Sequence, residues 1–269
     1  MLLSCGTGAW RVRSSMNTLA RELGITCTAD IGLLSIEYTC IAGGDCYTES
    51  LCLFNTGVNT SKLYRMELFV NKFATNCKKM SGDELHTLLD QIHEIHGFYS
   101  PPFLGLAAAV ACCAFTFLLG GGPIEMFCAF LGAGAGNYLR AKMNQHHLTL
   151  FLCTAASVAL ACVVYTISFM ALKSGFDVSI HHQAGYICSM LFIIPGFPFI
   201  TSGIDLAKLD MRSGLERLTY AIIIIAVATL TAWMLALVLH LKPMDFLPLG
   251  LNKFQYLIFR LIAKLFLEC

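Results

Sequence analysis

The residues best suited to chemistry lie in one stretch, Ile193 to Leu218, where an apolar run is interrupted by polar groups. The stretch combines helix-breaking residues, two hydroxyls and one acid, at Pro195, Gly196, Pro198, Thr201, Ser202 and Asp205. Broken backbone and buried polar groups are tolerated at membrane depth only where they line a cavity or pack against protein. We therefore predict that these six residues bind a small polar solute or line its path, as broken helices do in secondary transporters.

Asp205 is the predicted site of proton coupling. Burial favours the neutral form of a carboxyl group, so a buried acid could take up and release a proton as the site opens to each side of the membrane. The alternative is structural, with Asp205 as a helix-terminal acid that pairs with Lys208 or Arg212. The sequence leaves both roles open.

A second notable stretch alternates glycine and alanine from Gly132 to Gly136 and is followed by Asn137. Small residues allow helices to approach closely, so close packing is the favoured interpretation. A slim helix that lines a translocation path is the other, and under it Asn137 joins the candidate translocation residues. Arg140 and Arg217 could attract an anionic solute, although basic residues at such positions more often only set topology.

Composition divides the chain into a conventional part and an apolar part. The protein is 57% apolar and only 13% charged, against roughly 25% charged in an ordinary soluble domain. Residues 1–100 hold eighteen of the thirty-five charged side chains. We predict a polytopic α-helical membrane protein of about five transmembrane helices with an N-terminal α+β cytoplasmic domain. The predicted boundaries are 1–100 for this domain, 101–242 for the transmembrane domain and 243–269 for an amphipathic tail.

The N-terminal part shows the patterns of a small α+β domain. Apolar spacing predicts helices over 9–23 and 62–77, and Gly24 ends the first of them. Ser81 and Glu84 form a capping box that opens a third helix. Strands are expected at 25–29, 34–39 and 47–54, with a turn at 43–45 between the last two.

The rest of the chain contains five apolar segments near the length of a membrane span, which is about twenty residues. They cover 103–120, 124–139, 147–172, 184–204 and 218–241. Lys and Arg in short loops mark the cytoplasmic side, and they concentrate in the second-to-third and fourth-to-fifth loops. Those loops then lie on the same side as the N-terminal part, which has no recognisable secretory signal. The predicted location of the N-terminal domain is therefore the cytoplasm.

Several classes of function find no support in the sequence. No nucleophile elbow, P-loop or dinucleotide fingerprint is present, so we predict no enzyme and no cofactor. The net charge of +1 and the lack of a basic, aromatic-rich patch argue against nucleic acid. No metal is expected, because four cysteines of the N-terminal part lack paired spacing: Cys27, Cys40, Cys46 and Cys52. His86, Asp90 and His93 share a helix face, for which a solvated polar face is favoured over a metal site.

Three motifs together resemble the threonine/serine exporter family, specifically its YjjP-type half. The first is Gly8-Ala9-Trp10-Arg11-Val12, ahead of a long helix. The second is Pro195-Gly196-Phe197-Pro198 followed by Asp205-Leu206, and the third is Ser213-Gly214-Leu215-Glu216-Arg217. The family usually has an asparagine near Thr201, so this sequence departs from the pattern there.

The resemblance implies a secondary-type exporter of the bacterial inner membrane, driven by an ion or proton gradient. Its substrates would be threonine and serine, or a dicarboxylate such as succinate. Members of this half are similar to partners of a smaller, YjjB-type membrane subunit, so the expected partners are the lipid bilayer, that subunit and/or further copies of this chain. The alternative function is a membrane-anchored sensor or scaffold with a soluble ligand-binding domain.

Overall fold

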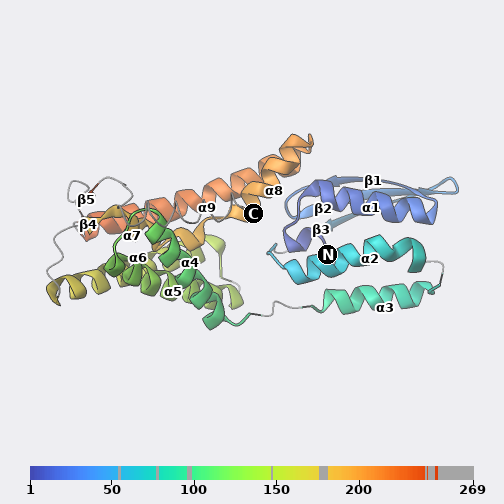
Figure 1. The fold of residues 1–269 in the computed structure, drawn as a ribbon. Coiled ribbons are helices and arrows are strands. Elements are labelled where there is room, and N and C mark those ends of the chain that lie inside the picture. The colour runs from blue at the N-terminus through green and yellow to red at the C-terminus, as the bar shows by residue number, and fades with distance from the viewer. Residues whose placement is uncertain are drawn as a thin grey trace, which may run out of the picture. The chain divides into compact units, whose positions relative to one another are not determined.

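The computed structural model describes residues 1–53, 56–76, 79–95, 99–146, 148–175, 181–239, 241 and 246–247. Most of these residues are helical, and the chain divides into two compact units (Figure 1). The first unit comprises Met1–Phe98 and Pro195–Ile222, and the second comprises Tyr99–Ile194 and Ile223–Cys269. The domain boundaries at 100 and 242 were drawn from sequence alone and stay predictions. The division into units shows in addition that Pro195–Ile222 belongs to the same compact unit as the N-terminal residues.

The first unit joins a three-stranded antiparallel sheet to a set of helices. Its strands, in the order β1-β2-β3, are β1 (Thr26–Ile31), β2 (Ser35–Ala42) and β3 (Asp45–Cys52). Its helices are η1 (Leu3–Cys5), α1 (Ala9–Leu23), α2 (Thr60–Asn76), α3 (Gly82–His93), α8 (Gly196–Ala207) and the first part of α9 (Met211–Val238). The predicted three helices and three strands of residues 1–95 are confirmed, with shifts of a few residues at most ends.

Local chemistry explains where these elements begin and end. Gly24 ends α1 in the left-handed conformation, at φ +69°, which glycine adopts without steric cost. The capping box of α3 is formed, because the Glu84 N–H donates to the Ser81 hydroxyl while the Ser81 N–H donates to the Glu84 carboxylate. Gly43 and Gly44 both have positive φ in the turn between β2 and β3.

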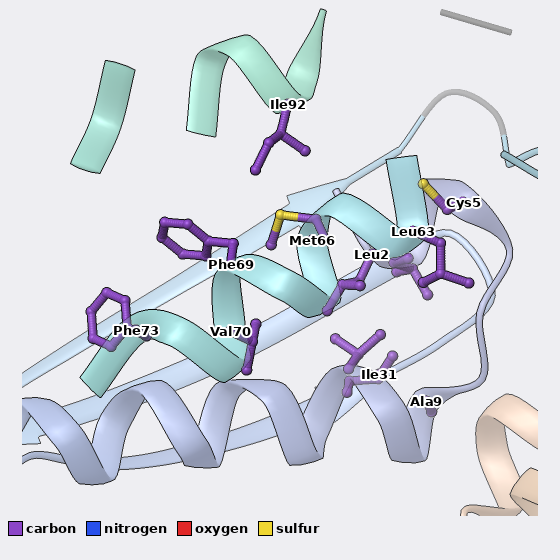
Figure 2. Packing of buried hydrophobic residues seen from close by; sticks show 12 residues of the cluster. Leu2, Cys5, Ala9, Ile31, Leu63, Met66, Phe69, Val70, Phe73 and Ile92 are labelled. Atoms are coloured by element: carbon purple, nitrogen blue, oxygen red, sulfur yellow. The ribbon is translucent and has the colours of Figure 1, made fainter. Parts of the chain in front are cut away.

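The core of the first unit lies among α1, α2, α3 and the sheet. In Figures 1 and 2, α2 lies between α1 and α3, and α1 packs against β1. Figure 2 shows Ile92 of α3 above Met66 and Phe69 of α2, and Ile31 of β1 beside α1. These side chains are buried, as are Val12 and Ala20 of α1. The apolar spacing of α1 and α2 thus marks their inner faces, except at the end of α1, where Leu23 is exposed.

In the part that the structure describes, the second unit is helical apart from one short strand pair. It contains α4 (Pro101–Leu118), α5 (Pro123–Gln145), α6 (Leu150–Gly175), α7 (Gln183–Cys188), η2 (Leu191–Ile193) and the rest of α9. Strands β4 (His181–His182) and β5 (Phe246–Leu247) pair in parallel. Helix α5 packs against both α4 and α6. Its first turn is capped by Glu125, whose carboxylate accepts the Gly122 N–H at 2.7 Å.

Among the described residues, three helices are long and apolar enough to cross a membrane: α4, α6 and α9. A fourth span is present if the bent pair formed by 184–193 and α8 counts as one. The break predicted within the 184–204 segment is present, because the chain bends at Ile194–Pro195, where proline cannot continue a helix. Helix α5 occupies the predicted second span without meeting the same test, so the count of five stays a prediction. Most of the predicted tail, 243–269, lies outside the described residues.

The glycines of α5 are contact points between helices. A Cβ on Gly132 would come within 2.7 Å of the Ala161 carbonyl oxygen on α6, and one on Gly136 within 2.7 Å of the Ser157 carbonyl oxygen. On the other side, a Cβ on Gly134 would lie 3.2 Å from the Ala109 Cβ of α4. Backbone approach this close requires glycine. These contacts support the packing interpretation of the Gly132–Gly136 stretch.

Replacing Gly136 with alanine is expected to destabilise the second unit. Overpacking costs about 1–3 kcal/mol, which outweighs the helix-propensity gain of up to about 1 kcal/mol. The thermal midpoint of the detergent-solubilised chain measures the effect. Gly203→Ala is the control, because a Cβ at this exposed position meets no atom within 4 Å. Equal stabilisation by both substitutions would contradict the packing role.

Candidate functional site

Asp205 lies at the centre of a buried polar cluster in the first unit. It is fully buried on α8, and its carboxylate accepts two backbone N–H groups, Ala9 N at 3.0 Å and Trp10 N at 3.3 Å. These are the first N–H groups of α1, which lack partners inside the helix. The residue before them is Gly8, which has no side chain to supply a cap. Asp205 therefore caps α1 from 196 positions away in the sequence.

Ser213 and Arg217 complete the cluster from the first turns of α9. The Ser213 hydroxyl donates to Asp205 Oδ2 at 3.0 Å and accepts from Arg217 Nε at 3.1 Å. Arg217 Nε also lies 3.4 Å from Asp205 Oδ2, which makes an ion pair between two buried side chains. Because Ser213 and Arg217 are four residues apart on one helix, they present their polar atoms on the same face.

Arg217 is only 2% exposed, and it also contacts the N-terminal segment. Its Nη1 donates to the Gly6 carbonyl oxygen at 2.9 Å. Its Nη2 has no hydrogen-bond partner within the part of the chain that the structure describes. A buried guanidinium with unused donors is costly unless a further acceptor reaches it. This atom is where an additional polar group could bind.

The pairing predicted for Asp205 as a structural acid is wrong in its partners. Lys208 places its ammonium 4.8 Å from the centre of the Trp10 ring, a cation–π contact. Arg212 pairs with Asp30 and Glu216. The basic residue that pairs with Asp205 is Arg217, one helical turn beyond Ser213. A tight turn joins α8 to α9, and in it Leu209 has a φ of +63°.

Further contacts join the start of α9 to the sheet and α1. The Leu33 N–H, in the turn between β1 and β2, donates to Glu216 Oε2 at 2.6 Å. Arg13 of α1 pairs with Asp210, just before α9. The polar cluster is thus flanked by ion pairs that bind α1 and the β1–β2 turn to the α8–α9 segment.

The two hydroxyls predicted to contact solute are engaged within the fold. Thr201 Oγ1 donates to the Phe197 carbonyl oxygen at 3.0 Å, and Ser202 Oγ donates to the Gly214 carbonyl oxygen at 2.8 Å. Both side chains are buried. Each oxygen keeps acceptor capacity, so the hydroxyls can still receive a hydrogen bond.

The helix-breaking residues lie at the start of α8. Pro195 is its N-cap residue, Gly196 is its first residue, and Pro198 follows in the first turn. The N–H that proline lacks is unpaired at this position in any helix, so the prolines cost α8 little here. Six of the seven predicted site residues therefore lie on α8 or at its cap.

Asn137, the seventh predicted residue, belongs to the second unit. Its side-chain amide donates to the Leu104 carbonyl oxygen at 2.8 Å and so joins α5 to α4. One turn later, Arg140 Nη1 donates to the Phe192 carbonyl oxygen of η2 at 3.4 Å. Both side chains make contacts between helices of this unit.

The three motifs behind the sequence resemblance meet in this cluster. Asp205 comes from the second motif, the capped N–H groups from the first, and Ser213 and Arg217 from the third. Sequence reasoning placed Asp205 in the site but missed Ser213, the Gly6 carbonyl and the ion pair with Arg217. The four-residue spacing of Ser213 and Arg217 was a usable signal, whereas a backbone carbonyl carries none. Within the described ranges, no group of three His, Cys, Asp or Glu side chains could hold a metal ion.

Replacing Gly8 with alanine is expected to disturb the cluster. A Cβ there would lie 2.7 Å from Asp205 Oδ1 and 3.0 Å from Trp10 Cδ1. At φ −64° the backbone suits any residue, so the penalty is purely steric, about 1–3 kcal/mol. Chemical unfolding of the purified chain measures it, with Gly57→Ala as the control, since a Cβ there meets no atom within 4 Å. Equal stability of the two variants would argue against tight packing at Gly8.

All residues of the Asp205 cluster lie within the region that matches a known protein family. The family model described as "Putative threonine/serine exporter" matches residues 1–240. The chain is 26% identical over 241 residues to the "Probable succinate transporter subunit YjjP" of Escherichia coli (strain K12), with 86% of this chain and 90% of the relative covered. It is 25% identical over 242 residues to the protein of the same name from Klebsiella aerogenes, with the same coverage. No solved structure matches the chain.

Proposed function

Because the chain belongs to the threonine/serine exporter family, a family of membrane transporters, we propose that it is one subunit of a secondary-type exporter of small polar metabolites. The substrate class is amino acids such as threonine and serine, or dicarboxylates such as succinate. The names of the two relatives refer to succinate, which makes a dicarboxylate the first substrate to test. The chemistry common to all these solutes is a carboxylate group.

The observation that carries the proposal is the buried pair of Asp205 and Arg217 beside a broken helix. Buried ion pairs cost desolvation energy, and packed apolar residues would often serve stability equally well. Their presence on α8 and α9, next to the hydroxyls of Thr201 and Ser202, suits a site that exchanges charge with a solute. The unused Nη2 of Arg217 is the group proposed to receive the solute's carboxylate, in a charge-assisted hydrogen bond.

The proposed coupling step follows from the contacts of Asp205. Both oxygens of its carboxylate receive hydrogen bonds from donors: two backbone N–H groups and the Ser213 hydroxyl. A proton on either oxygen would face one of these donors, so proton uptake would break at least one contact. The cap of α1 would then loosen while Arg217 loses its counter-charge and becomes available to the solute. Proton binding and solute binding are thereby linked at one cluster.

The proposed topology keeps the N-terminal domain in the cytoplasm of a bacterium, with about five spans in the inner membrane. The basic residues predicted to mark the cytoplasmic side include Lys208 and Arg212, and these contact Trp10 and Asp30 of the N-terminal segment. A loop in contact with the soluble domain has to be on the same side of the membrane. These contacts support the predicted placement of the fourth-to-fifth loop and the N-terminal domain on one side of the membrane.

The proposed partner is a smaller, YjjB-type membrane subunit, with or without further copies of this chain. The test is efflux of labelled succinate, threonine and serine from cells that express this chain alone, with such a subunit, or neither. We expect efflux of at least one solute only when both subunits are present. If both are inserted and none of the solutes leaves faster than from empty cells, the exporter proposal is wrong. Binding of a solute by the purified chain would then favour the sensor alternative.

A further inference from the structure

Two cysteine thiols face each other across the sheet of the first unit, away from the Asp205 cluster. Cys27 on β1 and Cys40 on β2 are direct partners in the antiparallel register. The Cys40 thiol donates to Cys27 Sγ, with 3.4 Å between the two sulfur atoms. Both side chains are half-buried, so a small molecule in solution can reach them.

The strand register gives this pair the spacing of a disulfide. The Gly32 N–H donates to the Ser35 carbonyl oxygen at 2.9 Å, which fixes the alternation of hydrogen-bonded and non-hydrogen-bonded pairs along β1 and β2. Counting back from Gly32, Cys27 opposite Cys40 is a non-hydrogen-bonded pair. Opposite Cα atoms in such pairs are about 4.5 Å apart, within the range of about 4.4–6.8 Å that a disulfide spans. Side-chain rotation alone can therefore close the bond.

In the described part of the chain, the other two cysteines of the sheet have no cysteine opposite them in the strand register. Cys46 and Cys52 on β3 are exposed, and they lie opposite Ile41 and Ser35. They provide reference thiols on the same sheet. Burial, followed by the contact with Cys40, raises the pKa of Cys27 to about 11, so at neutral pH Cys27 is a thiol.

We propose that Cys27 and Cys40 form a reversible dithiol–disulfide site that is oxidised by low-molecular-weight disulfides such as oxidised glutathione. One cysteine thiolate attacks a sulfur of the small disulfide, and one equivalent of small thiol leaves. The second cysteine then attacks the protein-bound sulfur of the mixed disulfide, and the second equivalent of small thiol leaves. Two electrons pass from the protein pair to the small disulfide, and the two protons of the pair end on the two small thiols. A small dithiol reverses the reaction.

The test uses the full-length chain in detergent, with Cys46→Ser introduced so that the cross-link can be assigned. The protein is treated with oxidised glutathione, free thiols are alkylated, and the chain is cut after glutamate. Cleavage after Glu37 separates Cys27 from Cys40, and cleavage after Glu49 separates both from Cys52. Mass spectrometry then identifies which peptides are joined, before and after reduction with dithiothreitol.

We expect the peptides of Cys27 and Cys40 to be joined, and the joined form to exceed glutathione-modified Cys27 by about tenfold or more, because the second thiol is held in place. Reduction should separate them. In Cys40→Ser protein, no such link should form and Cys27 should retain glutathione. The proposal is overturned if Cys27 and Cys40 stay alkylatable while Cys52 becomes glutathione-modified, or if the link joins Cys27 to Cys52. The Cys46→Ser protein decides the matter by itself if Cys40→Ser fails to fold.

Discussion

Replacing Asp205 with alanine is expected to destabilise the first unit by about 3–5 kcal/mol, the cost of removing one partner of a buried ion pair. The change leaves Arg217 buried without its counter-charge and removes the acceptor for the first two N–H groups of α1. The denaturant midpoint of the solubilised chain measures the loss. Asp30→Ala is the matched control, because it removes a carboxylate from an exposed ion pair, worth about 0–1 kcal/mol.

A double-mutant cycle separates the ion pair from the cap. Arg217→Met removes the cation while keeping a long apolar side chain, and the double variant Asp205→Ala/Arg217→Met buries no unpaired charge. We expect the double variant to be more stable than the sum of the two single losses predicts, by about 0.5–3 kcal/mol. What remains lost in the double variant belongs largely to the α1 cap. If Asp205→Ala unfolds at the midpoint of Asp30→Ala, the buried cluster does not hold the unit together.

The parts of this fold that depend on neighbouring residues were predictable. Helix α1 begins at Ala9 and ends at Leu23 as its apolar spacing and Gly24 predict, and the capping box of α3 is formed by the two residues that its motif names. Each of these signals operates within a few residues of chain, where side-chain identity and backbone geometry are directly related.

The contacts of Asp205 could not be predicted by the same means. Its cap partners are backbone N–H groups, which every residue except proline carries, and they lie 196 positions away in the sequence. Three basic residues follow Asp205, and spacing alone did not favour Arg217 over Lys208 or Arg212. That choice depends on the turn at Leu209, where a non-glycine residue with positive φ redirects the chain.

The path of the apolar segments was also only partly predictable from the sequence. Hydropathy located the helices of the second unit, but it treated 184–204 as one span where the chain bends before α8. The proline in that segment was noted as a break, yet how far a helix bends depends on what packs against it. For α8, those partners come from the N-terminal segment: Phe197 lies against Gly6, and Asp205 binds the start of α1.

Asp205→Asn is expected to abolish gradient-driven export while the chain still inserts. The asparagine side chain has one acceptor oxygen, and an NH₂ group replaces the other carboxylate oxygen. Because both carboxylate oxygens of Asp205 accept hydrogen bonds, this NH₂ group would face a donor whichever oxygen it replaces. It also cannot take up a proton as a carboxylate does. The measurement is export by vesicles that contain both subunits, with an imposed proton gradient, and Asp30→Asn as the control.

A second readout separates proton coupling from a merely structural role. Exchange of labelled for unlabelled solute at equal concentrations on both sides needs an intact solute path but no net proton movement. If Asp205 couples proton movement to solute movement, the asparagine variant should lose net export down to background. Its exchange rate should stay within about tenfold of that of the unmodified chain, which corresponds to a change of at most about 1.4 kcal/mol in binding or in the barrier. Equal loss of exchange and export would assign Asp205 to the structure of the path. Export at the level of the Asp30→Asn control would remove Asp205 from the mechanism altogether.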